Sequence, residues 1–373
     1  MYINFWYPVC LSDELQDKPV KVTILGLEFV AFRDSNGDAH CLSDVCVHRG
    51  GSLAGGLCHQ EDNTIACPYH GWRYNGSGKC TQIPSLGPGS KIPARAKVDS
   101  YPVEEKYDIV FAFLGDLSEK DRPPLYEIEE YSAEGWRANK TITIDINYNY
   151  ERSIENGLDP AHNEFIHPTH GFEGTKNDYK VNPTQITDTD WGANFAQLFD
   201  APPLDKEVYG DEARQESGDL TVFGGYRGPN TLITQIHTKQ DINWFHQYFF
   251  EQPINQFQTK IFFVNMRNWL MDENMDAMVM ERNMIIANED IAVMTDLRPS
   301  VTPPVSTKET MVPADLIIGK YRSTLEDFKN KGYKIDIKEL EDRQHETAFS
   351  IPCPDRKTEK NWVLDPIPLM KGK

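Results

Sequence analysis

The stretch Asp159-Pro-Ala-His162-Asn-Glu-Phe-Ile-His167-Pro168 places a carboxylate and two imidazoles within ten residues. On a helix, Asp159 and His162 would share one face, because they are three residues apart. His162 and His167 are five apart and diverge by roughly 140° on a regular helix. Both can bind one ion only where the helix distorts or ends, and Pro168 predicts an end. Two imidazoles, a distant carboxylate and open positions form the facial triad of non-haem Fe(II) sites. The alternative is a polar helix end whose histidines cap carbonyl groups.

A second ligand set lies upstream, where Cys46-Val-His48 is followed after eighteen residues by Cys67-Pro-Tyr-His70. Two thiolates on one iron and two imidazoles on the other form the Rieske type of [2Fe-2S] cluster. A structural zinc site is the alternative, but zinc sites usually place a cysteine pair before a histidine pair. Here each half carries one cysteine and one histidine, which favours the iron–sulfur cluster. Glycines follow both ligand loops, so backbone amides can approach the sulfurs closely.

The two motifs together resemble the terminal oxygenase (alpha) subunit of the Rieske non-haem iron oxygenases, over essentially the whole chain. The length is similar to that of members built from alpha subunits alone, such as vanillate and dicamba O-demethylases, ketosteroid hydroxylases and pheophorbide oxygenase-like proteins. The resemblance implies an α+β fold in two domains. An all-β Rieske [2Fe-2S] domain is expected over residues 1–124. A mononuclear iron domain, built from an antiparallel sheet with covering helices (helix-grip, START-like), is expected over residues 125–373.

The third iron ligand is expected in the segment 272–297, whose apolar residues recur at three- and four-residue steps as in an amphipathic helix. Asp290 lies four residues after Ile286, on or beside the apolar stripe, where an unpaired carboxylate would be costly. Helical phase alone leaves Glu281, Glu289 and Asp296 as competitors. The run Glu289-Asp290-Ile291 before Arg298-Pro299 is similar to the family's third-ligand segment, so the resemblance favours Asp290.

The resemblance assigns a role to each motif residue. It implies that the cluster is held by Cys46, His48, Cys67 and His70, and the mononuclear iron by His162, His167 and Asp290. Asp159 is implied to be the bridging carboxylate, which receives electrons from His70 of a neighbouring subunit in a homotrimer and orients His162. Dihydroxylating relatives often place an asparagine four residues before this aspartate, whereas Asn156 stands three before it. A role for Asn156 is therefore not carried over.

Composition narrows the class of partner. The chain has 373 residues, 39% hydrophobic and 11% aromatic, which fits two globular domains. Its net charge of −19 argues against nucleic acid or an anionic membrane as a partner. No apolar run is long enough to span a bilayer and no signal-type segment is evident, so we expect a cytoplasmic protein. Seven scattered cysteines indicate reduced thiols rather than a disulfide framework.

Hydrophobic periodicity predicts the remaining elements. Alternating runs predict strands over 20–25, 28–33, 108–114, 138–148, 232–237 and 256–266, with hairpin turns at 34–38 and 74–78. The charged, proline-ended run 116–124 predicts a domain boundary. The polar segment 173–217 predicts long irregular loops, and 314–331 predicts a further amphipathic helix.

The stretch from Arg49 to Lys97 is basic within an acidic chain. Its six basic residues outnumber Glu61 and Asp62 and leave a net charge of +4; they are Arg49, Arg73, Lys79, Lys91, Arg95 and Lys97. The functional interpretation is a docking face for an acidic electron donor, a ferredoxin or an NAD(P)H-dependent reductase. The alternative is a solvated face whose charge arose by chance.

The sequence thus predicts an oxygenase that uses O2 to hydroxylate or demethylate a small to medium aromatic or alicyclic substrate. Arene cis-dihydroxylation is an alternative within this class. In another class, the chain would be an electron-transfer or redox-sensing protein without oxygenase activity, but a large second domain with a full ligand set argues against this alternative.

Overall fold

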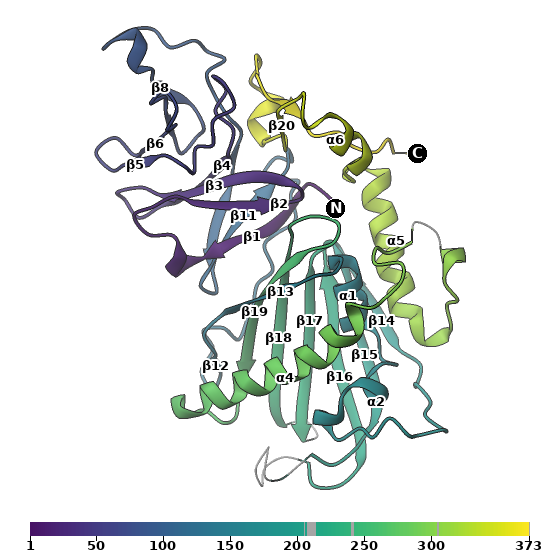
Figure 1. Cartoon of the computed structure of the whole chain (residues 1–373). Helices are drawn as coiled ribbons and strands as arrows, with labels where there is room; N and C mark the ends of the chain where they lie inside the picture. Colours follow the sequence, from purple (N-terminus) through teal and green to yellow (C-terminus); the bar gives the residue numbers. More distant parts are fainter. Residues whose placement is uncertain (205, 207–213, 240–241, 304–305, 373) are drawn as a thin grey trace. The chain divides into compact units, whose positions relative to one another are not determined.

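The computed structural model describes the chain except residues 205, 207–213, 240–241, 304–305 and 373. Its described part forms two compact units (Figure 1). The first comprises Met1–Leu125 and Asp327–Lys373, and the second comprises Tyr126–Glu326. The sequence placed residues 327–373 in the catalytic domain, whereas here this segment packs with the first unit. Within the described residues, no helix is long and apolar enough to cross a membrane.

The first unit is built mainly from three small antiparallel sheets. One sheet has the order β1-β11-β10, with β1 (Phe5–Leu11), β10 (Val103–Lys106) and β11 (Ile109–Leu114). A second has the order β2-β3-β4-β9, with β2 (Val20–Ile24), β3 (Leu27–Arg33), β4 (Ala39–Ser43) and β9 (Ser100–Tyr101). The third runs from β5 to β8, with β5 (Leu57–His59), β6 (Thr64–Ala66), β7 (Arg73–Asn75) and β8 (Cys80–Gln82). The predicted all-β character and the strands expected near 20–25, 28–33 and 108–114 are confirmed.

The predicted hairpin turns are confirmed as well. Between β3 and β4, the Asp34 carboxylate accepts hydrogen bonds from the backbone N–H groups of Asn36 at 2.9 Å and Asp38 at 3.1 Å. Gly37 occupies the left-handed region at φ 89°, which glycine adopts without a Cβ clash. The Asn75 carboxamide likewise accepts from the turn that joins β7 to β8. These turns fix the register of the strands that support the cluster loops.

A buried ion pair ties the C-terminal segment to the first unit. Arg356 donates to both carboxylate oxygens of Asp99, at 2.6 and 2.7 Å, and the Asp99 side chain is fully buried. Ser350, from the short parallel pair β20 (Phe349–Ser350) and β21 (Asp365–Pro366), donates to the same carboxylate. Helix α6 (Ile337–Arg343) precedes this pair. Because Asp99 and Arg356 are 257 residues apart, sequence periodicity could not reveal this packing.

The second unit is organised around an eight-stranded antiparallel sheet (Figure 1). Its main order is β12-β19-β18-β17-β16-β15-β14, and β13 also pairs with β19. The strands are β12 (Arg137–Ala138), β13 (Ile142–Ile146), β14 (Gln185–Thr189), β15 (Gly192–Ala201), β16 (Gly218–Arg227), β17 (Thr231–Lys239), β18 (Ile242–Pro253) and β19 (Thr259–Arg267). The predicted antiparallel catalytic sheet is confirmed.

Helices accompany this sheet. The long helix α4 (Asp276–Met294) lies across it in Figure 1, and its Met294 packs with Ile144, Ile146 and Phe263 of the strands. Helices α1 (Tyr150–Leu158) and α2 (Asn163–Ile166) follow β13. The helices expected over 272–297 and 314–331 are confirmed as α4 and α5 (Leu316–Asn330). The candidate metal ligands thus lie on helix α4 and at the two ends of helix α2.

The expectation of irregular loops over 173–217 is wrong for part of the segment. Residues Gln185–Thr189 and Gly192–Ala201 form β14 and β15, which pair with each other. In β15, Ala193, Phe195 and Gln197 are buried while Asn194 and Leu198 are exposed. Several of these positions carry polar residues, so the hydrophobic alternation that marks a strand was weak in the sequence.

Candidate metal centres and substrate cavity

A break between two helices positions the first two candidate iron ligands. Helix α1 ends at Leu158, and Asp159 follows with extended backbone, because the residue before a proline avoids the helical region. The expectation that Asp159 and His162 share one helix is therefore wrong. His162 instead caps the short helix α2, which ends at Ile166, so that His167 precedes Pro168. The predicted helix end at Pro168 is confirmed.

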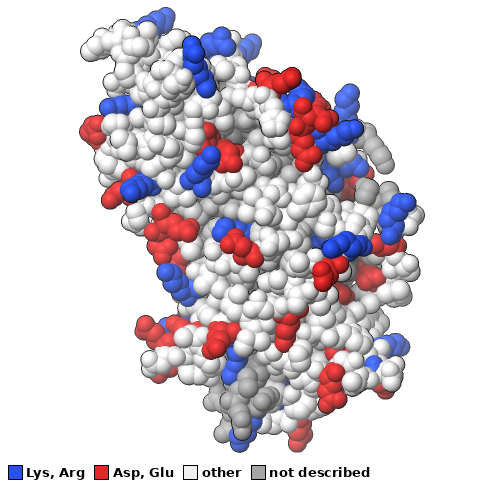
Figure 2. All heavy atoms as spheres, in the orientation of Figure 1, with Lys and Arg blue, Asp and Glu red and all other residues white. Residues whose placement is uncertain are grey.

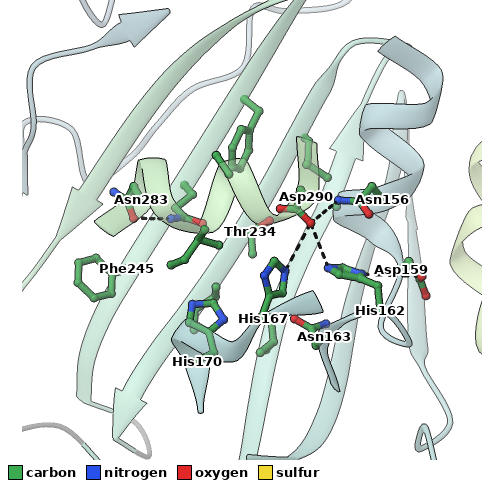
Figure 3. A pocket seen from close by; sticks show the side chains of 18 of the residues that line it. Asn156, Asp159, His162, Asn163, His167, His170, Thr234, Phe245, Asn283 and Asp290 are labelled. Atoms are coloured by element: carbon green, nitrogen blue, oxygen red, sulfur yellow. Dashed lines mark hydrogen bonds and ion pairs between the residues drawn. The ribbon is translucent and has the colours of Figure 1, made fainter. Parts of the chain in front are cut away.

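His162, His167 and Asp290 converge on one point (Figure 3). Asp290 Oδ1 lies 3.8 Å from His162 Nε2 and 3.5 Å from His167 Nε2. One ligand atom from each residue lies within 4.8 Å of the other two. Two ligand atoms on one ion with metal–ligand bonds of about 2.1 Å lie at most about 4.2 Å apart, and both Asp290 distances satisfy this limit. The three residues that the sequence proposed as iron ligands therefore lie together, although 123 positions separate His167 from Asp290 in the sequence.

The far side of each imidazole faces a different carboxylate. His167 Nδ1 lies 2.9 Å from Glu289 Oε2, which fixes the ring with Nε2 toward Asp290. The Thr169 hydroxyl donates to the other oxygen of Glu289 at 2.5 Å. His162 Nδ1 is buried and has no hydrogen-bond partner in the described part of the chain, and Asp159 Oδ2 lies 3.8 Å away. Glu289, a rejected competitor for ligation, thus orients a ligand, and Asp159 lies beside the other.

Asn156 contacts the third ligand directly. Its Nδ2 donates to Asp290 Oδ1 at 2.9 Å, from the last turn of α1 (Figure 3). The sequence left Asn156 without a role because its spacing to Asp159 departs from the family pattern. The sequence offered one signal for this contact: an amide side chain near the end of the helix that precedes the predicted metal ligands.

Burial determines the protonation states of His162 and Asp290. Burial lowers the pKa of His162 to about 3, with His167 adding to the effect, so the ring is neutral and its nitrogen lone pair is available. Burial raises the pKa of the Asp290 carboxyl, which His167 and Asn156 partly oppose. A cation bound between them would offset the cost of burying this carboxylate. Neutral imidazoles, one carboxylate and the unsatisfied nitrogen of His162 therefore fit a divalent metal.

The cluster loops of the first unit repeat one backbone pattern. In the first loop Cys46 N–H donates to Gly51 O and Gly50 N–H donates to Cys46 O, at 2.8 and 2.9 Å. In the second loop, Cys67 N–H donates to Trp72 O and Gly71 N–H to Cys67 O, again at 2.8 and 2.9 Å. Gly50 and Gly71 both have left-handed backbone, at φ 72° and 69°. The two motifs therefore form matched loops, each presenting a cysteine and a histidine.

The four cluster residues lie side by side, with the thiols inside and the imidazoles outside. Cys46 and Cys67 are buried in the core of this unit, and the ring centroids of His48 and His70 are 4.5 Å apart. His48 Nδ1 is buried without a partner, while His70 is exposed. A Cβ on Gly51 would lie only 2.9 Å from Cys67 Sγ, so a side chain would crowd the sulfur. An unsatisfied imidazole nitrogen beside two thiols fits a cluster with mixed ligands.

Tyr74 and Trp72 support these ligands. The Tyr74 hydroxyl lies 3.2 Å from Cys46 Sγ, and hydrogen bonds to cluster sulfurs tune the reduction potential. Trp72 stacks on His48, with ring centroids 4.6 Å apart and planes inclined by 5°. The sequence analysis did not single out Tyr74, which lies four residues beyond the second histidine.

The metal group opens into a cavity of about 260 Å³ inside the second unit. Most of its lining is apolar, with contributions from the sheet and from α4, including Ile146, Leu232, Phe245, Phe249, Ile261 and Ile286. A few polar groups interrupt this lining. Among them, Gln247 donates to Asn283 Oδ1 at 3.2 Å, and Thr234 lies nearby (Figure 3). The cavity can enclose a mainly apolar molecule beside the metal ligands.

Two family descriptions match separate parts of the chain. Residues 5–102 match the Rieske [2Fe-2S] domain, and residues 146–330 match the vanillate O-demethylase oxygenase C-terminal domain. The chain belongs to the Rieske non-haem iron oxygenases. The first unit of this Rieske oxygenase thus holds the [2Fe-2S] domain. In the second unit, the group formed by His162, His167 and Asp290 is consistent with the mononuclear iron site.

Individual proteins are also similar to this chain. The phenoxybenzoate dioxygenase subunit alpha of Ectopseudomonas oleovorans is 34% identical over 191 residues, covering 48% of this chain and 46% of that protein. The chain thus spans about half the length of curated relatives that it matches. The structure of Pseudomonas putida CBB5 NdmA with caffeine matches 88% of this chain and 91% of its own, with a TM-score of 0.74 and 24% identity. Dicamba monooxygenase bound to 3,6-dichlorosalicylic acid matches with a TM-score of 0.69 and 19% identity, over 87% and 96% of the two chains. At these identities the structural likeness supports the fold alone.

Proposed function

We propose that this protein is the terminal component of a multicomponent oxygenase. It would use O2 and electrons from NAD(P)H, relayed by a reductase or ferredoxin, to hydroxylate or oxidatively demethylate an organic substrate. The observation that carries the proposal is the position of His162, His167 and Asp290, which form a group able to bind a metal at the wall of a mainly apolar cavity. A protein that only transferred electrons would have no need for such a cavity.

Each residue of the site has a physical task in this proposal. His162, His167 and Asp290 would hold one Fe(II) and leave positions open, and iron in such a site activates O2 when it is reduced. Glu289 holds the His167 ring by its Nδ1 atom, and Asn156 holds Asp290. Fixing the ligands in this way keeps the open positions directed into the cavity.

The cavity lining favours a substrate with a largely apolar body. Aromatic and branched aliphatic side chains dominate the walls, and Arg214 and Arg282 are among the few charged residues that also line the cavity. The carboxamides of Gln247 and Asn283 stand on opposing elements, β18 and α4, and can orient a single hydroxyl, carbonyl or ether group. We therefore infer a small to medium aromatic or alicyclic substrate, such as a methoxyarene.

Electron delivery is proposed to occur between copies of the chain. His70 is exposed on the first unit, and its neighbour Tyr69 is a 62% exposed aromatic residue. On the second unit, Phe165 is 58% exposed and lies between His162 and His167 in the sequence. Large exposed apolar side chains beside both metal sites suit burial against a second copy. We therefore propose that His70 of one subunit meets Asp159 of another, within a homotrimer.

The electron donor is proposed to dock on part of the basic stretch. Three of the six basic residues form ion pairs within the first unit: Arg73 pairs with Asp62 at 2.7 Å, and Lys79 and Lys97 share Glu359 at 3.1 and 2.6 Å. In the described part of the chain, the other three are exposed and form no ion pair; they are Arg49, Lys91 and Arg95. On the face drawn in Figure 2, basic side chains gather at the end of this unit near β8. These residues suit an acidic partner.

Charge reversal distinguishes the exposed basic residues that form no ion pair in the described part of the chain from those held in ion pairs. Arg95→Glu should slow cluster reduction by an acidic ferredoxin in stopped-flow measurements, and added salt should shrink the difference. Lys79→Glu is the matched control, because Lys79 is held in an ion pair with Glu359. Equal rates for both variants and the unaltered protein, at low and high salt, would show that the donor docks elsewhere.

Oxygen uptake with a panel of aromatic and alicyclic compounds tests the oxygenase itself. Reductase, ferredoxin and NADH are supplied, and products are identified by mass spectrometry. We expect uptake and a hydroxylated or demethylated product from the unaltered protein and neither from His162→Ala, which keeps the cluster. Uptake that is the same in both proteins would place the reaction outside the proposed iron site.

A further inference from the structure

We propose that Glu251 is a buried proton donor to the reaction cavity, acting through the hydroxyl group of Ser153; this inference rests on the proposed oxygenase function. Glu251 is neither a metal ligand nor a lining residue, and the sequence analysis did not single it out. Its place in the sheet and its surroundings assign this role.

The strand β18 directs Glu251 toward the same side of the sheet as the cavity. Side chains alternate along a strand, and Phe245, Gln247 and Phe249 all line the cavity. Glu251 is the next residue of this row, and its neighbour on β19 is Ile261, another lining residue. The carboxyl group therefore lies behind one end of the cavity wall.

Glu251 is completely buried and poorly satisfied. Its exposed fraction is 0%, and neither carboxyl oxygen has a hydrogen-bond partner among the residues that the structure describes. Burial raises the pKa of Glu251 to about 8, an effect that Ser153 partly opposes. An ionised carboxylate in this position would lack the partners that a buried charge requires. At neutral pH the group is therefore a carboxylic acid that carries a proton.

Ser153 connects this acid to the cavity. Ser153 lies on α1, and its side chain lines the cavity together with Tyr148. Among the described residues its hydroxyl makes no hydrogen bond to Glu251, but it lies close enough to lower the pKa of both Glu251 and Tyr148 against the larger effect of burial. A hydroxyl group can accept one proton while it donates another. Ser153 can thus pass a proton from Glu251 to a molecule in the cavity, whereas burial keeps Tyr148 protonated.

The proposed reaction needs this proton. Hydroxylation converts R–H, O2, two electrons and two protons into R–OH and water, and without a substrate the same electrons and protons reduce O2 to H2O2. The electrons come from the donor protein. Glu251 supplies one proton through Ser153: its O–H bond breaks as an O–H bond to Ser153 Oγ forms, and the original Ser153 O–H bond breaks as an O–H bond to the reduced oxygen forms. Solvent supplies the other proton. The carboxylate recovers its proton from solvent through Ser153 once the product has left.

Glu251→Gln tests the proposal because it keeps the shape and removes the exchangeable acid. Reduced protein is mixed with O2, with and without anisole as a neutral probe, and cluster re-oxidation is followed by absorbance. The background from His162→Ala is subtracted. We expect a fall of roughly 100-fold, typical of a lost general acid, with cluster and iron content unchanged. Asp145→Asn is the matched control, since this carboxylate on β13 pairs with Lys260 and is 74% exposed.

A second readout needs no turnover. The infrared spectrum near pH 7 should contain the carbonyl stretch of a protonated carboxyl group that Glu251→Gln lacks. Absence of that band, or re-oxidation by Glu251→Gln as fast as by the unaltered protein, would overturn the proton-donor role alone. Unaltered protein that consumes no more O2 than His162→Ala would instead refute the proposed oxygenase function, and the donor role with it.

Discussion

Replacing Glu251 by Gln should stabilise the second unit, and increasingly so as the pH rises. The folded-state pKa of Glu251 is about 8, against an ordinary value of 4.5. Because the folded pKa is raised, the stability that the protonated acid contributes is complete below about 4.5 and is lost as the pH rises through about 8. Each pKa unit corresponds to about 1.4 kcal/mol, so the penalty approaches 3 to 5 kcal/mol at pH 7 to 8. Gln carries no such penalty.

Differential scanning calorimetry across this pH range measures the effect. A difference of about 3 kcal/mol shifts the Tm of a unit of this size by roughly 6 to 12 °C. Near pH 4.5 the two proteins should unfold at similar temperatures. Asp276→Asn is a control of opposite sign, because hydrogen bonds from Arg137 and Arg267 lower the pKa of Asp276 to about 2. That variant should be destabilised. A Glu251→Gln variant with a lowered Tm, or a shift independent of pH, would refute the reasoning.

Three further predictions concern the carboxylates of Asp159, Glu289 and Asp276. Asp159→Asn should keep the mononuclear iron but slow cluster oxidation by roughly 10- to 100-fold in single-turnover absorbance traces, because an amide offers one acceptor oxygen instead of two; unchanged kinetics would contradict the bridge. Glu289→Gln should weaken iron binding by about 10- to 100-fold in metal titrations, since Glu289 orients His167, and full affinity would count against this role. Asp276→Asn should destabilise the second unit by about 3 kcal/mol in calorimetry, because it leaves the buried Arg267 uncompensated. Hydrogen bonds from Arg137 and Arg267 lower the pKa of Asp276 to about 2, so this stability is present above about 3.8 and is lost as the pH falls toward 2.

Local spacing was sufficient to propose both ligand sets. The paired Cys-x-His and Cys-x-x-His loops and the His162 and His167 pair are short-range patterns that local chemistry explains. Asp290 required more, because helical phase places several carboxylates near the apolar stripe. Glu289 and Asp290 are adjacent, and the structure uses both: one faces His167 Nδ1 and the other faces His167 Nε2. Only the packing of α4 against the α2 segment separates these roles.

Contacts between residues far apart in the chain determine the features that the sequence could not reveal. The Arg356–Asp99 pair helps to hold residues 327–373 in the first unit, and Glu359 pairs with two lysines of the basic stretch. In the sequence, Glu251 is indistinguishable from an ordinary polar residue near the end of a strand. Its burial appears only once α1 covers that end of the sheet. Such contacts join positions far apart in the chain, where neither hydrophobic periodicity nor motif spacing carries information.

Metal analysis tests the central claim, that one iron outside the cluster is held by His162, His167 and Asp290. Purified protein should contain about three irons and two acid-labile sulfides per chain, with the visible absorbance of a Rieske cluster. His162→Ala should contain about two irons with the same sulfide content and the same absorbance. Stoichiometric zinc without sulfide, or an equal iron content in both proteins, would contradict the account.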